Sequence, residues 1–111
     1  MSGKGKPSFY KKTEKQFPKV MEALEKLGTT LRSSGPLDDK TSHLIQLAAA
    51  AAMGSEGSVC SHTKRALQAG ASPEEISHAI ILLVSTIGFP QTMAALSWSQ
   101  EVLQKKEKTK K

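Results

Sequence analysis

The residues best suited to chemistry lie between Glu56 and Gly70. This stretch holds the single cysteine, Cys60, two residues before His62, and a helix is predicted there from about Ser58. A thiol becomes reactive when its pKa is lowered by the N–H groups of a helix's first turn or by a nearby cation. On a regular helix, however, residues two apart point about 160° away from each other. A reactive Cys60 therefore requires that the helix begin after it; otherwise Cys60 is an inert, buried thiol.

Other titratable groups could share this site. Glu56 could orient His62 or act as a general acid–base group, or it could be a solvated carboxylate. His43, His62 and His78 each fall in a different predicted helix, and together with Cys60 they offer the nitrogen and sulfur ligands that zinc prefers. None of the short ligand spacings of structural zinc sites is present, so we expect no metal and no cofactor.

Hydrophobic periodicity predicts about five helices and no strand. The first begins at Pro18 and should turn one apolar stripe toward a core: Phe17, Val20, Met21, Leu24, Leu27 and Leu31. After a break at residues 33–36, a second helix should begin near Asp38 or Asp39 and end at Met53. Its alanines at 48–52 permit close approach of neighbouring helices, which favours burial between several of them.

The helix that follows Gly70 has the strongest local signals. Ser72 as N-cap, Pro73 in the first turn and Glu75 three residues after the cap form a capping box. Apolar residues from 76 to 87 cover nearly its whole circumference, which places it at the centre of a bundle or at a subunit interface. Gly88 to Pro90 should end it, and a fifth helix should run toward the lysine-rich tail. The sequence thus predicts an all-α, single-domain bundle that forms oligomers.

The basic excess, a net charge of +6 over 111 residues, lies at the two ends. Residues 1–16 carry five Lys and one Glu, and residues 101–111 carry five Lys and two Glu. We therefore expect a flexible basic arm over 1–16, a helical domain over 17–106 and a basic tail over 107–111. Lysines that lie in polar ends, rather than clustered on a folded face, do not indicate nucleic-acid binding. No apolar run approaches the length of a membrane span, so we expect a cytoplasmic protein that binds no membrane.

The stretch from Lys40 to Pro90 resembles the alkylhydroperoxidase D-like and carboxymuconolactone decarboxylase family. The likeness is carried by Lys40-Thr41, Leu44-Ile45 and the alanine-rich helix, by His62 with Ala66, Leu67 and Gly70, and by Ala71 to Ile76. It implies an all-helical fold of small subunits, a homo-oligomer from dimer to hexamer, and a small-molecule substrate.

Redox members of this family carry two cysteines, three residues apart, with a histidine four residues after the second. With His62 as that histidine, the cysteine positions fall on Ser55 and Ser58, which cannot form the dithiol of a peroxidase. A register that aligns Cys60 with the first cysteine displaces the histidine and the Ala-Leu-Gly signature, so we favour the first. The family's proton-relay glutamate then falls on His43. The resemblance implies a site of His62, His43, Ser58 and Cys60, with Glu56 nearby.

Three functions remain open. The first is a weak one-cysteine peroxidase-like oxidoreductase, in which Cys60 is oxidised to a sulfenic acid and reduced by an external thiol. The second, implied by the decarboxylase branch of the family, is a cofactor-free acid–base enzyme on a small carboxylated or lactone substrate, with proton transfer by His62 and His43. The third is a non-catalytic helical oligomer with a decayed site. Peroxide turnover separates the first from the others.

Overall fold

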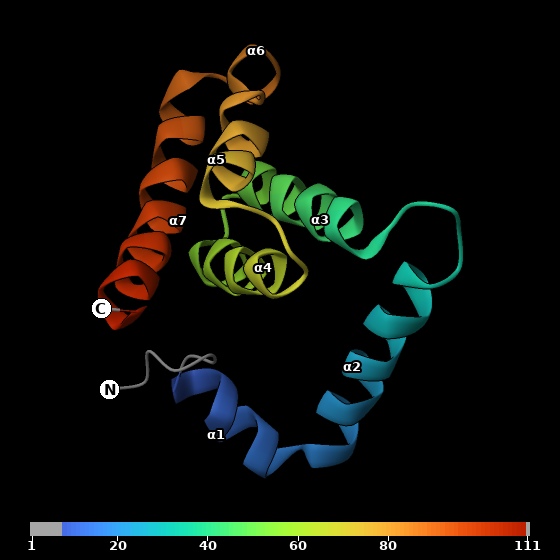
Figure 1. Ribbon diagram of the computed structural model, residues 1–111. Coiled ribbons are helices and arrows are strands. Elements are labelled where there is room, and N and C mark those ends of the chain that lie inside the picture. The colour runs from blue at the N-terminus through green and yellow to red at the C-terminus, as the bar shows by residue number, and fades with distance from the viewer. Residues whose placement is uncertain (1–7, 111) are drawn as a thin grey trace. The chain divides into compact units, whose positions relative to one another are not determined.

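A computed structural model of the chain describes the backbone of residues 8–110 and the side chains of residues 10–105. Over these residues the structure is all-helical, as predicted, with helices α1 to α7 (Figure 1). The chain divides into two compact units, which we call the N-terminal unit, up to Asp39, and the C-terminal unit, from Lys40 onward.

The N-terminal unit holds α1 (Ser8–Gln16) and α2 (Pro18–Arg32). Helix α2 begins at Pro18 as predicted, because proline's fixed φ and missing N–H suit the first turn. It ends where the hydroxyls of Ser33 and Ser34 both donate to the carbonyl of Thr30, which offers the chain an alternative to the next helical bond. Asp39 then pairs with Arg32 at 3.7 Å.

Two expectations for the N-terminal unit do not match the structure. Helix α1 was not expected: it lies within the stretch predicted as a flexible arm, and its lysine, glutamate and glutamine residues are good helix formers. Residues 1–7 lie outside the described part. The apolar stripe of α2 was expected to face a core, but α2 has no buried residue. A single neighbouring helix, α1, cannot cover it.

The C-terminal unit contains α3 (Asp39–Met53), α4 (Glu56–Gln68), α5 (Pro73–Ile81), α6 (Val84–Ile87) and α7 (Phe89–Lys110). Helix α7 runs along both α4 and α5 (Figure 1). Helices α3, α4, α5 and α7 all contribute to one hydrophobic core, whose buried members are Leu47, Ala50, Ala51, Val59, Ala66, Ala71, Ile76, Ile80, Ala95 and Leu103. Alanine on α3 is buried as expected, although Ala49 and Ala52 face outward.

The capping box at the start of α5 is confirmed. The Ser72 hydroxyl accepts from the Glu75 N–H at 3.0 Å, and the Glu75 carboxylate accepts from the Ser72 N–H at 2.9 Å. Glycine ends α4 as predicted, because Gly70 has a φ of 101°, a conformation that side chains with a Cβ rarely adopt. Gly88, with a φ of 95°, likewise separates α6 from α7.

The prediction of one uninterrupted helix from Pro73 to Gly88 was wrong. Leu82 and Leu83 form a turn between α5 and α6. A helix that is apolar all round cannot bury every side when neighbours cover only one of them. The turn leaves Leu82 60% exposed but allows Leu83 to pack against the core.

Candidate active site

Helix α4 carries most of the predicted site residues, and its start decides their chemistry. It begins at Glu56, two residues earlier than predicted, because Ser55 acts as its N-cap and accepts a hydrogen bond from the Ser58 N–H at 3.3 Å. The two positions where redox relatives carry cysteines are therefore joined in a helix cap. Ser58 is exposed, and neither serine offers a nucleophile for peroxide.

Cys60 consequently lies inside α4 rather than before it. Its half-buried thiol donates to the carbonyl oxygen of Trp98 on α7, with 3.8 Å between Sγ and the oxygen. Burial raises the pKa of this thiol above its ordinary value, the charge of Glu56 raises it further, and Lys64 opposes them more weakly. The hypothesis of a thiol activated at a helix start was therefore wrong, because the N–H groups of the first turn lie a turn earlier.

The two histidines suggested by the resemblance lie on consecutive helices of the C-terminal unit. His43 on α3 is buried, with 6% exposed, and His62 on α4 is half-buried. In both, the Nδ1 atom is shielded from solvent. Helices α3 and α4 are joined by only Gly54 and Ser55. Imidazole groups removed from bulk water are suited to directed proton transfer.

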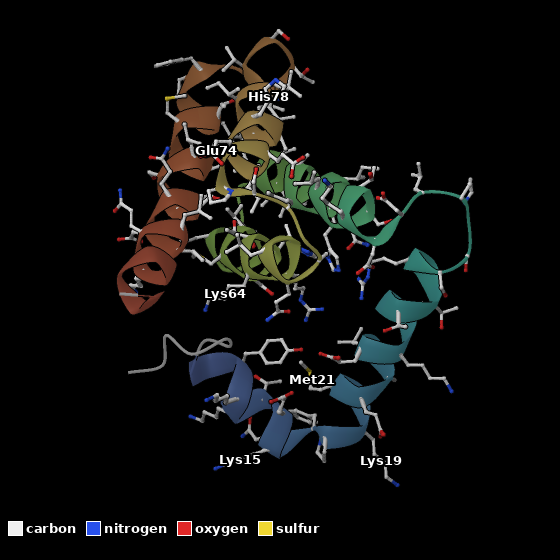
Figure 2. The ribbon with its side chains drawn as sticks, in the orientation of Figure 1. Lys15, Lys19, Met21, Lys64, Glu74 and His78 are labelled. Carbon is white, nitrogen blue, oxygen red and sulfur yellow. The ribbon has the colours of Figure 1, made fainter. Side chains whose placement is uncertain are left out.

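The two other titratable candidates, His78 and Glu56, are both exposed. The exposed His78 lies on α5, whereas Lys64, close to His62 in the chain, lies on α4 (Figure 2). Glu56 is exposed in the first turn of α4, where its charge suits the helix dipole. Among the described residues no group of three or more His, Cys, Asp or Glu could hold a metal ion. The structure therefore does not gather His43, His62, His78 and Cys60 into a metal site.

Sequence reasoning missed a buried polar contact between α4 and α7. The hydroxyls of Thr63 and Ser99 lie 2.8 Å apart, and both side chains are fully buried. Thr63 continues the buried line of Val59 and Ala66 on α4, so its burial could have been read from helical spacing. Nothing in the sequence links it to Ser99. The pair fixes the position of α7 on the face of α4 beside Cys60.

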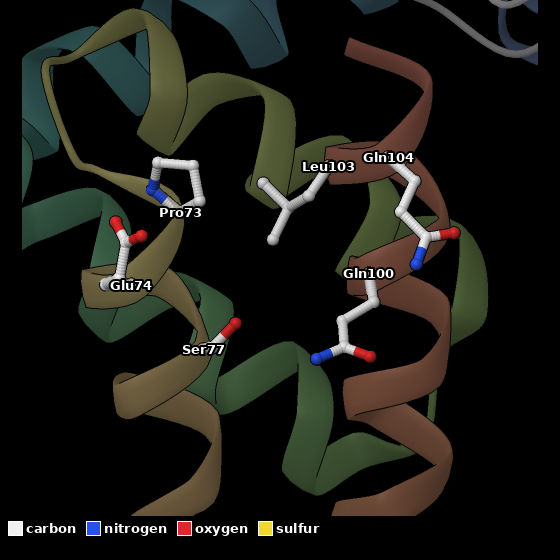
Figure 3. A pocket seen from close by; sticks show the side chains of 6 residues that line it. All are labelled: Pro73, Glu74, Ser77, Gln100, Leu103 and Gln104. Atoms are coloured by element: carbon white, nitrogen blue, oxygen red, sulfur yellow. The ribbon is translucent and has the colours of Figure 1, made fainter. Parts of the chain in front are cut away.

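A pocket of about 300 Å³ lies between α5 and α7 (Figure 3). It contains none of the predicted site residues and is lined by Pro73, Glu74, Ser77, Gln100, Leu103 and Gln104. His43 and His62 therefore do not line this cavity.

Two residues that carried the resemblance meet in the structure. Lys40, at the start of α3, forms an ion pair with Glu75 of α5 at 3.1 Å. The backbone hydrogen bond from Ser72 and the bond from Lys40 hold the pKa of Glu75 below its ordinary value. This ion pair links the first turn of α3 to the capping box of α5.

Comparison with known proteins decides the family. The model of the carboxymuconolactone decarboxylase family matches residues 18–101, well beyond the stretch from Lys40 to Pro90 that first suggested it. The chain belongs to this family. It is also 32% identical over 89 residues to the Uncharacterized protein MJ1511 of Methanocaldococcus jannaschii, an alignment that covers 80% of this chain and 83% of the relative. No solved structure matches it significantly. Within the described residues, no helix is both long and apolar enough to cross a membrane.

Proposed function

We propose that this protein is a cofactor-free acid–base enzyme acting on a small carboxylated substrate, with His62 as its proton-transfer residue. The observation that supports the proposal is that His43 and His62, on the consecutive helices α3 and α4, each have an Nδ1 atom shielded from solvent. Imidazole has an ordinary pKa close to neutral pH, so it can both give and accept a proton there. The alternative of a one-cysteine peroxidase has less support, because Cys60 lies inside α4 rather than before it, and burial raises the pKa of its thiol.

Decarboxylation of a carboxylated lactone, the reaction named in the family's description, suits these residues. The bond between the substrate carbon and its carboxylate breaks, CO2 leaves, and the remaining electron pair delocalises toward the lactone carbonyl. The imidazolium of His62 then protonates the substrate carbon, and His43 supplies the next proton to His62. The step consumes one proton and needs no external electrons.

Cations that could bind a substrate carboxylate follow His62 within one turn of α4. Lys64 and Arg65 are both half-buried, and the Arg65 Nε donates to the Ser61 hydroxyl at 3.4 Å. A guanidinium presents a fork of donors that matches a carboxylate. We assign Arg65 to substrate binding, and we propose that the enzyme works as a homo-oligomer between a dimer and a hexamer.

An assay of CO2 release from carboxymuconolactone tests the proposal. We expect His62→Gln to lower kcat/KM by about 100-fold or more, the usual contribution of a general acid. His43→Gln should lower it less and change its pH dependence. His78→Gln, an exposed histidine of the same unit, is the matched control and should match the wild type. Equal rates for the wild type and His62→Gln, or no turnover by the wild type, would contradict the proposal.

A further inference from the structure

The pocket between α5 and α7 has a chemistry of its own, distinct from that of the residues assigned to proton transfer (Figure 3). Its volume of about 300 Å³ is at the small end of the range for ligand-binding pockets, so it suits a small organic molecule. All six lining residues belong to the C-terminal unit, whose helices share one core. The walls of the pocket are therefore set within one folded unit.

Each of the two helices presents a pair of polar side chains to this pocket. Glu74 and Ser77 are three residues apart on α5, and Gln100 and Gln104 are four residues apart on α7. Residues at these spacings share one face of a helix. In Figure 3 the hydroxyl of Ser77 and the amide of Gln100 point toward each other across the pocket. The pocket is therefore polar on both of its sides.

These four polar side chains are not used to hold the fold together. Within the part of the chain that the structure describes, none of the four forms a hydrogen bond or an ion pair with another residue. The neighbouring Glu75 is the opposite case, because it belongs to the capping box and pairs with Lys40. The hydrogen-bonding capacity around the pocket is therefore available to a ligand.

The charge of the pocket selects the class of ligand. Among the described residues that line it, Glu74 is the only charged one, so the pocket attracts cations and repels anions. The Ser77 hydroxyl and the two glutamine amide oxygens can accept hydrogen bonds from N–H groups. Pro73 and the buried Leu103 add an apolar surface against which a short alkyl chain can pack.

We propose that this pocket binds a small organic cation with N–H donors, an ammonium or guanidinium group on a short alkyl chain. The Glu74 carboxylate balances its charge, and the Gln100 amide oxygen accepts one of its N–H groups. Because Glu74 is exposed to solvent, the dissociation constant should be on the order of millimolar. This binding is separate from the proposed proton transfer, since His62 does not line the pocket.

Titration of the full, 15N-labelled chain with butylammonium, followed by NMR at constant ionic strength, tests the proposal. We expect saturable shifts of backbone amides on the facing turns of α5 and α7, and a parallel titration with butylguanidinium identifies the preferred head group. Butyrate has the opposite charge and tetramethylammonium has no N–H donor, so both should bind at least about tenfold more weakly. No saturable shift with either head group, or equal binding of butyrate or tetramethylammonium, would overturn the proposal.

Variants of the two helices separate binding in the pocket from attraction to a surface charge. Glu74→Gln keeps the shape of the side chain and should raise the dissociation constant about tenfold or more. Glu101→Gln removes an exposed carboxylate of α7 that does not line the pocket, and this matched control should bind as the wild type does. Ser77→Leu from α5, or Gln100→Leu from α7, fills the pocket but keeps Glu74, and should also abolish binding. Circular dichroism checks the fold of each variant, and wild-type affinity in Glu74→Gln or in a folded filling variant would overturn the proposal.

Discussion

At the scale of single residues, Cys60 is a half-buried thiol inside α4 whose pKa is raised by burial. Its raised pKa keeps it protonated at neutral pH, so its alkylation by iodoacetamide should be slow there and should keep rising above pH of about 8.5, the ordinary thiol value. Ser58→Cys in a Cys60→Ser background is the matched control, since that side chain is exposed in the first turn of α4. The assignment would be contradicted if the pH at which the alkylation rate is half-maximal were lower for Cys60 than for the control.

The same shift has a consequence for stability. Because the folded-state pKa of Cys60 is raised, its neutral form stabilises the fold fully below the unfolded-state pKa, and this contribution is lost as pH rises toward the folded-state value.

Peroxide consumption should be equal for the wild type and Cys60→Ser, because the thiolate needed for attack is scarce.

Thr63 and Ser99 offer a second test at this scale. Removing one hydroxyl by Thr63→Val leaves the buried Ser99 hydroxyl without its partner, which should lower the free energy of unfolding by about 1–3 kcal/mol. Adding Ser99→Ala should restore part of that loss, since both polar groups are then gone. Urea unfolding of the two single variants and the double variant measures the coupling. Strictly additive losses would show that the hydroxyls do not interact.

At this scale, the sequence could predict a contact only when its two residues lie close together in the chain. The cap at Ser72 was predictable because its partner Glu75 is three residues away. The Ser55 cap was not predicted, because the helix was expected to begin near Ser58, three residues later. The contact of Cys60 with Trp98 joins residues 38 apart in the chain and had no local signal.

At the scale of elements, the N-cap of α4 controls where Cys60 lies. Ser55→Ala removes the acceptor of the Ser58 N–H and should destabilise the protein by roughly 0.5–2 kcal/mol. Ser58→Ala changes an exposed side chain in the first turn and should cost much less. Thermal unfolding of both variants, followed by circular dichroism, gives the comparison. Equal costs would mean that Ser55 does not cap the helix.

Helix boundaries were predictable where proline, glycine and capping residues coincide, as at Pro18, Gly70 and Ser72. They were not predictable where burial decides. The turn at Leu82 and Leu83 interrupts a run of good helix formers, because only some of its apolar side chains have a neighbour to pack against. The apolar stripe of α2 is a case in which the helix was predictable but its packing partner was not. Its periodicity correctly predicted a helix, but no single-chain pattern indicates whether the apolar face meets its own chain or another.

At the scale of the whole molecule, the two units differ in what holds them together. Every residue of the hydrophobic core cluster lies between Leu47 and Leu103, and α2 has no buried residue. The Lys40–Glu75 ion pair, the Thr63–Ser99 contact and the caps of α4 and α5 also belong to the C-terminal unit. The core and the candidate site therefore lie in the same unit, the C-terminal one.

This division predicts that residues 40–111 fold without the N-terminal unit. The shortened chain should keep a cooperative unfolding transition, because its core contacts are all internal, with a lower midpoint than the full chain since domains this small are marginal. Circular dichroism and Trp98 fluorescence during urea unfolding provide the measurement, with the full chain as control. A broad, non-cooperative transition would show that the first 39 residues are part of the folding unit.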